Sequence, residues 1–312
     1  MDSSLSMFYA LPVLAGLVVL AVAVAGFSGA LEARDRGLPL RTGFAMPARE
    51  AARLMHQRPR RTLSADRLLW RAASSAVIPL GVLIVAFVPL GAHSLVDHPL
   101  GLVWINALDV VAWAVMWLLG WGANSISGLV GGYRFLALAL AYELPLMFAL
   151  TAPAIAAGSL DLAEVAAAQD GLWFVVWAPV AFAAYCWGIL GFSVRPPMDP
   201  GAGADISGGI LAELAGVDRL LVLAGRYVLL VAGSAAAVPL FLGGGAGAVL
   251  PGWLWVLTKT LVLSVLLVGI GRRVPSLRPD KLLEVGWAVV IPLVIAQDLV
   301  VSIIAVATHE TP

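Results

Sequence analysis

The fold is decided by GLVGGYRFLALALAYELPLMFALTAPAIAA, residues 128–157, a run of thirty residues in which only Arg134 and Glu143 are charged. A helix needs about 20 predominantly apolar residues to cross a bilayer core about 30 Å thick. The run is longer than that, and two charges do not make it water-soluble. We therefore expect it to form a transmembrane helix.

The whole chain has the composition of a membrane protein. Of its 312 residues, 61% are hydrophobic and 12% are charged, and the mean hydropathy is +0.95. An average soluble domain has about 25% charged residues. Lys plus Arg equals Asp plus Glu at 19 each, so the net charge indicates no particular partner, and nucleic acid is not expected as one. The single cysteine, Cys186, excludes a disulfide within the chain and a paired-cysteine metal site.

Seven other runs are also apolar and long enough to cross a membrane. We therefore predict an all-α integral membrane protein, a single membrane domain over residues 1–312 with about eight transmembrane helices. The predicted spans are residues 7–31, 68–91, 102–124, 128–157, 171–193, 218–242, 251–271 and 282–307.

The basic residues predict the orientation of these spans. Ten of the 19 lie between Arg34 and Arg71, whereas the second, fourth and sixth connections contain no Lys or Arg. Because cytoplasmic loops carry an excess of Lys and Arg, we expect the odd-numbered connections to be cytoplasmic and both termini to lie outside. The main cytoplasmic loops would then be residues 32–67, 194–217 and 272–281, all approximately.

The first of these loops contains a short amphipathic segment. Met46, Glu50, Arg53 and Leu54 follow one another at i, i+4, i+7 and i+8, which is typical of one face of an interfacial helix. The alternative is a solvated basic loop that fixes the topology or contacts anionic lipid. Pattern alone leaves both interpretations open.

Seven ionisable residues lie within or near the ends of the predicted spans. A charge near the middle of a membrane helix costs at least a few kcal/mol, so each needs a function or a partner. The functional interpretation is a proton path, which the depth of Glu143 favours for that residue. The structural alternatives are ion pairs that fix helix register and side chains that snorkel to the interface. The seven are Asp109, Arg134, Glu143, Arg226, Lys259, Glu284 and Asp298.

We expect this chain to bind no metal and no redox cofactor. Its four histidines lie in two connections and the C-terminal tail without metal-ligand spacing, and it has no haem motif or set of cysteines for a cluster. Electrons used by any complex that contains it must therefore be carried by a partner.

Three segments, in order along the chain, resemble one family. Residues 120–125 (GWGANS) and 141–145 (AYELP) are similar to that family's G-W-x-S-N-S and S-Y-E segments, and residues 158–169 (GSLDLAEVAAAQ) to its G-S-L-N-L-S-E-I-V-x-A-Q. Residues 275–292 retain most of a third pattern, P-R-x-R-x-D-Q-L-M-x-x-G-W. The family is that of the H subunit of respiratory complex I, together with the matching subunit of membrane-bound hydrogenases.

The resemblance implies an eight-helix subunit that joins the membrane arm of a complex to its peripheral arm. Its cytoplasmic loops would help form a quinone cavity, and buried carboxylates would link quinone reduction to proton translocation. Quinone would be the substrate, and the iron–sulfur clusters with a flavin or nickel–iron centre would belong to partner subunits in a bacterial inner membrane. Membrane-bound hydrogenase or formate hydrogenlyase is the alternative, in which no quinone need bind. A secondary transporter is a remote alternative, opposed by the lack of an internal repeat.

The resemblance also implies roles for single residues, because residues 46–53, 195–199 and 213–216 are similar to the family's Q-P-x-A-D-x-x-K, R-x-P-F-D and E-Y-S-G segments. The implied quinone-cavity residues are Glu50, Arg53, Arg195 and Asp205. The implied proton-path residues are Glu143, Glu213, Asp199, Asp161 and Glu164, with Arg134, Arg226, Lys259 and Asp280 as further charged candidates.

The chain departs from the family in its acidic loop. Between Asp199 and Asp205 two of the family's carboxylates are missing, and Arg226 stands where the family has a glutamate. We therefore expect Arg226 to pair with Glu213 or Asp205, which lie in the same loop or just before the same helix.

Overall fold

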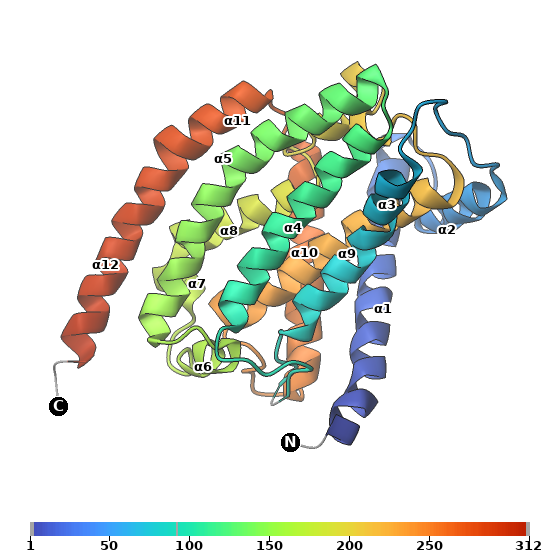
Figure 1. The fold of residues 1–312 in the computed structure, drawn as a ribbon. Helices are drawn as coiled ribbons and strands as arrows, with labels where there is room; N and C mark the ends of the chain where they lie inside the picture. Colours follow the sequence, from blue (N-terminus) through green and yellow to red (C-terminus); the bar gives the residue numbers. More distant parts are fainter. Residues whose placement is uncertain (1–2, 92, 310–312) are drawn as a thin grey trace.

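The computed structural model describes residues 3–91 and 93–309, and its regular elements are helices (Figure 1). All eight predicted apolar segments are helical, so the prediction of an all-α membrane protein is confirmed. Among the described residues, seven helices are long and apolar enough to cross a membrane, and one apolar helix is shorter, α8 (Pro179–Phe192). The seven are α1 (Ser3–Asp35), α3 (Arg67–Ala86), α4 (Gly101–Gly122), α5 (Ile126–Ala157), α9 (Gly216–Phe241), α10 (Gly252–Arg273) and the last segment, Pro279–Ala307.

The fifth predicted span differs from expectation because it is broken. It consists of a four-residue helix, α7 (Phe174–Trp177), then Ala178 in a non-helical conformation, then α8. Pro179 explains the break, because its ring disfavours a helical conformation at the preceding residue and it has no N–H to donate. At 1.5 Å per residue, the 14 residues of α8 extend only about 21 Å, less than a bilayer core.

The start of α8 is completed by a side chain from the end of the protein. The backbone N–H groups of Val180 and Ala181 donate to Oε1 of Gln297, at 2.8 and 3.2 Å. Gln297 belongs to α12 (Ile291–His309). Free N–H groups at a helix start need acceptors, and here the acceptor comes from a different helix.

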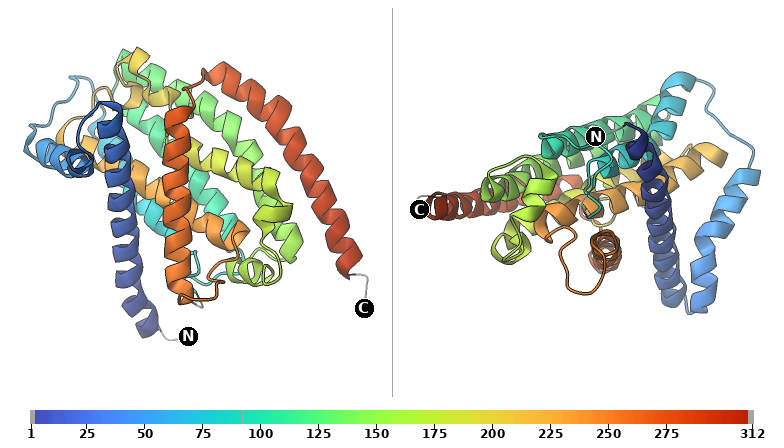
Figure 2. Two further views of the ribbon diagram at one scale, coloured as in Figure 1. Left: turned by 180° about the vertical axis from the view of Figure 1, so that it is seen from behind. Right: turned by 90° about the horizontal axis from the view of Figure 1, so that it is seen from below.

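The helices form one bundle around α5 and α9 (Figure 1). α5 contacts α4, α8 and α12, and α9 contacts α1, α3, α8 and α10. The hydrophobic core runs through these contacts. Of an apolar stretch of 18 residues in α9, 72% is buried. The start of α1, the end of α12 and the short α6 (Leu162–Ala167) lie at the same end of the bundle (Figures 1 and 2).

The amphipathic segment is a helix, α2 (Leu40–His56), so the helical alternative is the correct one. It lies at the end of the bundle opposite the termini and runs beside α1 (Figure 2). The two helices touch at glycines: a Cβ added to Gly43 would lie 2.5 Å from the carbonyl oxygen of Gly29. The side chains of Phe44 and Met55 remain exposed, as expected for a helix that lies on a membrane surface.

The connection from α8 to α9 lies at the same end as α2. It contains three short 3₁₀-helices, η1 (Pro200–Ala202), η2 (Ala204–Ile206) and η3 (Gly209–Leu211), and it packs on the first turns of α5. Gly131 permits this contact, because a Cβ there would lie 2.6 Å from the backbone nitrogen of Ile210.

The last segment lies at the outer edge of the bundle, alongside α5 (Figure 1). α11 (Pro279–Val285) continues through a π-helical turn, η4 (Gly286–Val290), into α12. Trp287 fixes the turn by donating from Nε1 to the carbonyl oxygen of Leu140 in α5, at 2.9 Å. Only 11% of an apolar stretch of 18 residues in this segment is buried, so most of its surface is open to lipid or to another protein of a complex.

Candidate functional site

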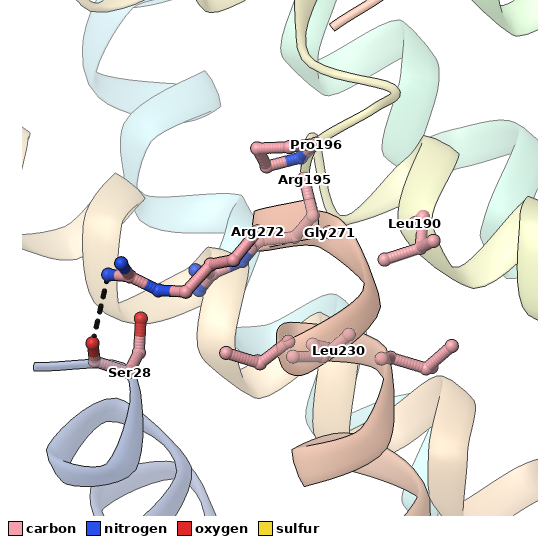
Figure 3. A pocket seen from close by; sticks show the side chains of 9 residues that line it. Ser28, Leu190, Arg195, Pro196, Leu230, Gly271 and Arg272 are labelled. Carbon is pink, nitrogen blue, oxygen red and sulfur yellow. Dashed lines mark hydrogen bonds between the residues drawn. The ribbon is translucent and has the colours of Figure 1, made fainter. Parts of the chain in front are cut away.

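A cavity lies where α1, α9 and α10 meet the connection from α8 to α9 (Figure 3). Its volume is about 240 Å³, slightly below the 300–1,000 Å³ of typical small-molecule sites. Its walls are mostly apolar, with two guanidinium groups at one side. The lining residues are Ser28, Leu190, Arg195, Pro196, Leu230, Leu267, Val268, Gly271 and Arg272.

Both arginines of the cavity are held in place by neighbours. Arg272 donates from Nη2 to the carbonyl oxygen of Ser28 at 3.0 Å (Figure 3) and from Nη1 to Oδ2 of Asp35 at 2.7 Å. The guanidinium carbon of Arg195 lies 3.7 Å from the centre of the Tyr227 ring, in a cation–π contact. The cavity therefore has two fixed positive charges and an apolar interior.

The segment after Arg195 is tied to the end of α10. Asp199 accepts a 2.6 Å hydrogen bond from Oγ of Ser276, and the carbonyl of Pro196 lies so close to Gly271 that a Cβ there would be 2.5 Å from its oxygen. These contacts close one side of the cavity. Asp199, one of the predicted proton-path residues, is thus near the cavity but does not line it.

Of the four predicted quinone-cavity residues, only Arg195 lines this cavity. Glu50 and Arg53 pair with each other on α2, through two hydrogen bonds of 2.7 and 2.6 Å. The hydrogen bond from Arg53 holds the pKa of Glu50 below its usual value. Asp205 accepts from Nη1 of Arg134 in α5, at 2.5 Å, and this hydrogen bond likewise lowers the pKa of Asp205.

Inside the bundle, Glu143 of α5 meets a second carboxyl, Asp109 of α4. The packing of α4 along α5 brings the two side chains together. Asp109 is 2% exposed. None of the four carboxyl oxygens receives a hydrogen bond from a donor group, although all four are buried.

The surroundings of this pair are closed and mostly apolar. A small cavity of about 10 Å³, close to the size of one water molecule, is lined by Asn106, Asp109 and Tyr185 together with apolar side chains. Tyr142 is fully buried, its hydroxyl has no hydrogen-bond partner, and both carboxyls act on it electrostatically. Within the part of the chain that the structure describes, the pair is therefore buried with polar neighbours and has no Lys or Arg partner.

The other predicted acids lie elsewhere. Asp161 caps α6 by accepting from the N–H of Ala163 at 2.7 Å, and Glu164 is exposed in the first turn of that helix. Both lie at the end of the bundle that holds the termini. Glu213 is half-buried just before α9 at the opposite end. The structure does not gather these acids around Glu143.

Among the further charged candidates, Arg226 differs from expectation. It donates to the carbonyl oxygens of Ser193 and Val194, and Asp205 is occupied by Arg134. The expected pairing of Arg226 with Asp205 or Glu213 is therefore wrong. A buried guanidinium needs acceptors, and the backbone at the end of α8 provides them.

Lys259 and Asp280 have structural partners. The ammonium group of Lys259 donates to the carbonyls of Leu242, Gly244 and Ala246, at 2.7, 2.9 and 3.0 Å, and lies 4.2 Å from the Trp173 ring centre. These contacts hold the connection from α9 to α10. Asp280 forms an exposed ion pair with Arg278, at 3.2 Å.

Sequence reasoning missed two features of the site. Asp109 was recognisable as an acid in an apolar run, but its contact with Glu143 depends on how α4 packs on α5. Arg272 was recognisable only as a basic residue at a helix end, because nothing in its neighbourhood in sequence indicates a cavity.

Comparison with known proteins gives one consistent result. The sequence profile of the family described as NADH dehydrogenase matches residues 5–302. An H subunit of NADH-quinone oxidoreductase from Geobacter metallireducens, designated H 1, is 32% identical over 282 residues, which cover 86% of this chain and 85% of that protein. A second relative is an H subunit of the same enzyme from Rhodopseudomonas palustris, designated H 2. It is 34% identical over 262 residues, which cover 83% of this chain and 82% of that protein.

Proposed function

The chain belongs to the NADH dehydrogenase family, whose members similar to it are H subunits of NADH-quinone oxidoreductase, and on that premise we propose how it works. It is a membrane subunit of an oxidoreductase complex that reduces a quinone and translocates protons. The quinone head group binds in the cavity beside Arg195 and Arg272. Protons pass through the buried carboxyls near Glu143.

The cavity between Ser28, Arg195 and Arg272 carries the quinone part of the proposal. A quinone head group is a flat apolar ring with two carbonyl oxygens, so it needs apolar walls and a few hydrogen-bond donors. Leu190, Leu230 and the other apolar residues supply the walls, and the guanidinium groups supply the donors. Arg remains charged at any physiological pH, so it also stabilises the negative charge that develops as the quinone accepts electrons.

The location of the cavity suits a substrate that is dissolved in the bilayer. It lies between α1 and α10, two of the helices suited to cross the membrane, and exposed apolar side chains such as Val18 and Val22 continue along α1. A long apolar quinone tail would remain in contact with such a surface while the head group occupies the cavity.

Electrons reach the quinone from a partner protein of the complex. α2 and the connection from α8 to α9 lie together at the end of the bundle near the cavity, and α2 exposes several charged side chains there. This end is the proposed docking surface for the subunits that hold the iron–sulfur clusters and the flavin. By the distribution of Lys and Arg it faces the cytoplasm of a bacterial cell, with both termini on the outer face.

Protons are translocated through the interior of the bundle. Glu143 and Asp109 lie between the cavity end, where Glu213 and Asp199 are found, and the opposite end, where Asp161 and Glu164 are found. The pair makes no contact with the acids at either end of the bundle, so water molecules or changes in helix packing must connect the pair to them. The proposal assigns Glu143 the central position.

Substitution of Arg195 in the purified complex tests the quinone site. Arg195→Leu removes a charged hydrogen-bond donor worth about 1.5–3 kcal/mol, so KM for a short-chain quinone should rise by about 10- to 100-fold. Arg273→Leu is the matched control, because Arg273 is exposed and does not line the cavity. An unchanged KM in Arg195→Leu, with no labelling of the cavity by a photoreactive quinone, would instead support the hydrogenase alternative.

A further inference from the structure

Asp109 is the one buried acid of the described chain that shares its site with another acid and has no basic partner. It is 2% exposed, and its neighbours in the small cavity include Asn106 and Tyr185, while Glu143 approaches it from α5. The hydroxyl of Tyr185 already donates to the carbonyl oxygen of Gly233, at 3.2 Å. The Tyr142 hydroxyl is also buried nearby, but it makes no hydrogen bond, and none of the four carboxyl oxygens of Asp109 and Glu143 receives one.

Elementary electrostatics limits the charge that such a pair can hold. Two negative charges a few Å apart in a medium of low dielectric constant repel strongly, so two adjacent carboxylates retain one proton between them. A protonated carboxyl can donate to its ionised neighbour, and one shared proton gives the buried oxygens their missing hydrogen bond. The absence of donors is thus explained if the site holds a proton.

We propose that Asp109 and Glu143 share one proton and that Asp109 is the group with which Glu143 exchanges it. In one state Asp109 is the acid and Glu143 the carboxylate; in the other state the proton has moved to Glu143 and Asp109 is the carboxylate. Only an O–H bond breaks and only an O–H bond forms, so no oxidant or reductant is required. The proposal deepens the proton path assigned above and rests on it for its role in translocation, but the shared proton itself does not depend on translocation.

The small cavity can hold a water molecule that accepts a proton from Asp109. It has room for about one water molecule, and it is bounded by Asn106 as well as Asp109. Oδ1 of Asn106 is buried and has no donor, so a water there could donate to it and accept from Asp109. Glu143 does not line this cavity, and so its proton reaches the water through Asp109.

Infrared spectroscopy of the purified complex detects the shared proton directly. A protonated carboxyl group has a carbonyl stretching band that shifts in heavy water, and the band lost in Glu143→Gln identifies the pair. We expect Asp109→Asn to shift or abolish that same band. Asp298→Asn is the matched control, since Asp298 is another partly buried membrane acid, bonded to Thr151 at 2.6 Å, and it should leave the band unchanged.

Asp109→Ser is a second variant, for the case that Asp109→Asn does not fold. The serine hydroxyl can donate to Glu143 but cannot release a proton at neutral pH. A band of Glu143 that is the same in wild type and in both Asp109 variants would overturn the proposal. So would a band that moves when sodium is added at constant pH, because the site would then hold a cation rather than a proton.

Proton pumping by the same variants separates this inference from the function proposed above. We expect Asp109→Asn to lower the number of protons pumped per quinone reduced, and Asp109→Asn combined with Glu143→Gln to pump no less than Glu143→Gln alone. A shifted infrared band with normal pumping in all variants would confirm the shared proton and overturn its role in translocation. An unshifted band with impaired pumping would overturn the shared proton and leave the proposed function in place.

Discussion

Arg134 of α5 binds Asp205 of η2, with 2.5 Å between Nη1 and Oδ2, and so ties a membrane helix to the connection that borders the cavity. The two residues are 71 positions apart in the sequence. Gly131, one turn earlier in α5, lets the same connection approach the helix closely. The position of the cavity wall therefore depends in part on one ion pair at its outer side.

The Arg134–Asp205 pair gives the connection a pH dependence. Arg134 lowers the pKa of Asp205, so the pair stabilises the folded connection at every pH above the unfolded value of about 4. That stabilisation is lost as the pH falls through the lower, folded-state pKa. We expect hydrogen exchange of residues 199–208, corrected for the intrinsic rate, to be constant from pH 8 to pH 5 and to rise only below about pH 4.

Asp205→Asn should make exchange in this connection fast at all of these pH values. Glu164→Gln is a suitable control, because Glu164 is exposed at the opposite end of the bundle. A rise in exchange that begins near pH 6 in the wild type would show that another group controls the connection.

Lys259 should be more important for stability than for chemistry. Lys259→Met leaves three carbonyl oxygens between α9 and α10 without their donor, and the loss of charged hydrogen bonds costs on the order of 2–4 kcal/mol. We expect a lower Tm of the solubilised complex with a nearly normal KM for quinone. Thr258→Val removes a single hydrogen bond to Leu254 within the same helix and should lower Tm far less. Equal effects of the two substitutions on Tm would contradict a stabilising role for the three hydrogen bonds from Lys259.

The contact between α1 and α2 should not tolerate a side chain. Gly43→Ala would gain up to about 1 kcal/mol of helix propensity, but its Cβ would lie 2.5 Å from the carbonyl oxygen of Gly29, and such overpacking costs about 1–3 kcal/mol. The clash is with backbone, which cannot rotate away, so the cost outweighs the gain.

We expect Gly43→Ala to displace α2 and to lower the yield of assembled complex, measured by native electrophoresis. Gly16→Ala in α1 is the control, because its Cβ would make only an ordinary contact of 3.6 Å with Leu257. Normal assembly of Gly43→Ala would mean that α2 can move on α1 without consequence.

Glu143→Gln should separate quinone reduction from proton translocation. The amide keeps the size of the side chain but cannot release a proton at neutral pH, so we expect pumping into vesicles to fall to near zero. Quinone reduction should persist when an uncoupler is present, because the substituted residue does not line the cavity. Unchanged pumping would remove Glu143 from the proton path.

The sequence predicts what local composition determines. Runs such as residues 128–157 are helical because no other structure satisfies their backbone in a membrane, and the spacing of Glu50 and Arg53 on α2 follows from the helical repeat. Pro179 was visible within the fifth predicted span, but its effect was not anticipated, because proline is often tolerated in membrane helices.

The site was less predictable because its contacts join distant parts of the chain. Asp109 meets Glu143 only through the packing of α4 on α5, and Arg272 faces the cavity only through the packing of α10 beside α1. The error on Arg226 has the same origin: its carbonyl partners carry no sequence signal, whereas the acids that it was expected to bind do.

The link between Gln297 and the start of α8 sets an order of events during synthesis. A ribosome completes α8 more than a hundred residues before it reaches Gln297, and until then the N–H groups of Val180 and Ala181 lack their acceptor in an environment where an unsatisfied group costs several kcal/mol. The fifth crossing can reach its final form only after the last helix has been made and has docked. A nascent chain that stops before residue 297 should therefore be a substrate for membrane quality control, even though most of its helices are already inserted.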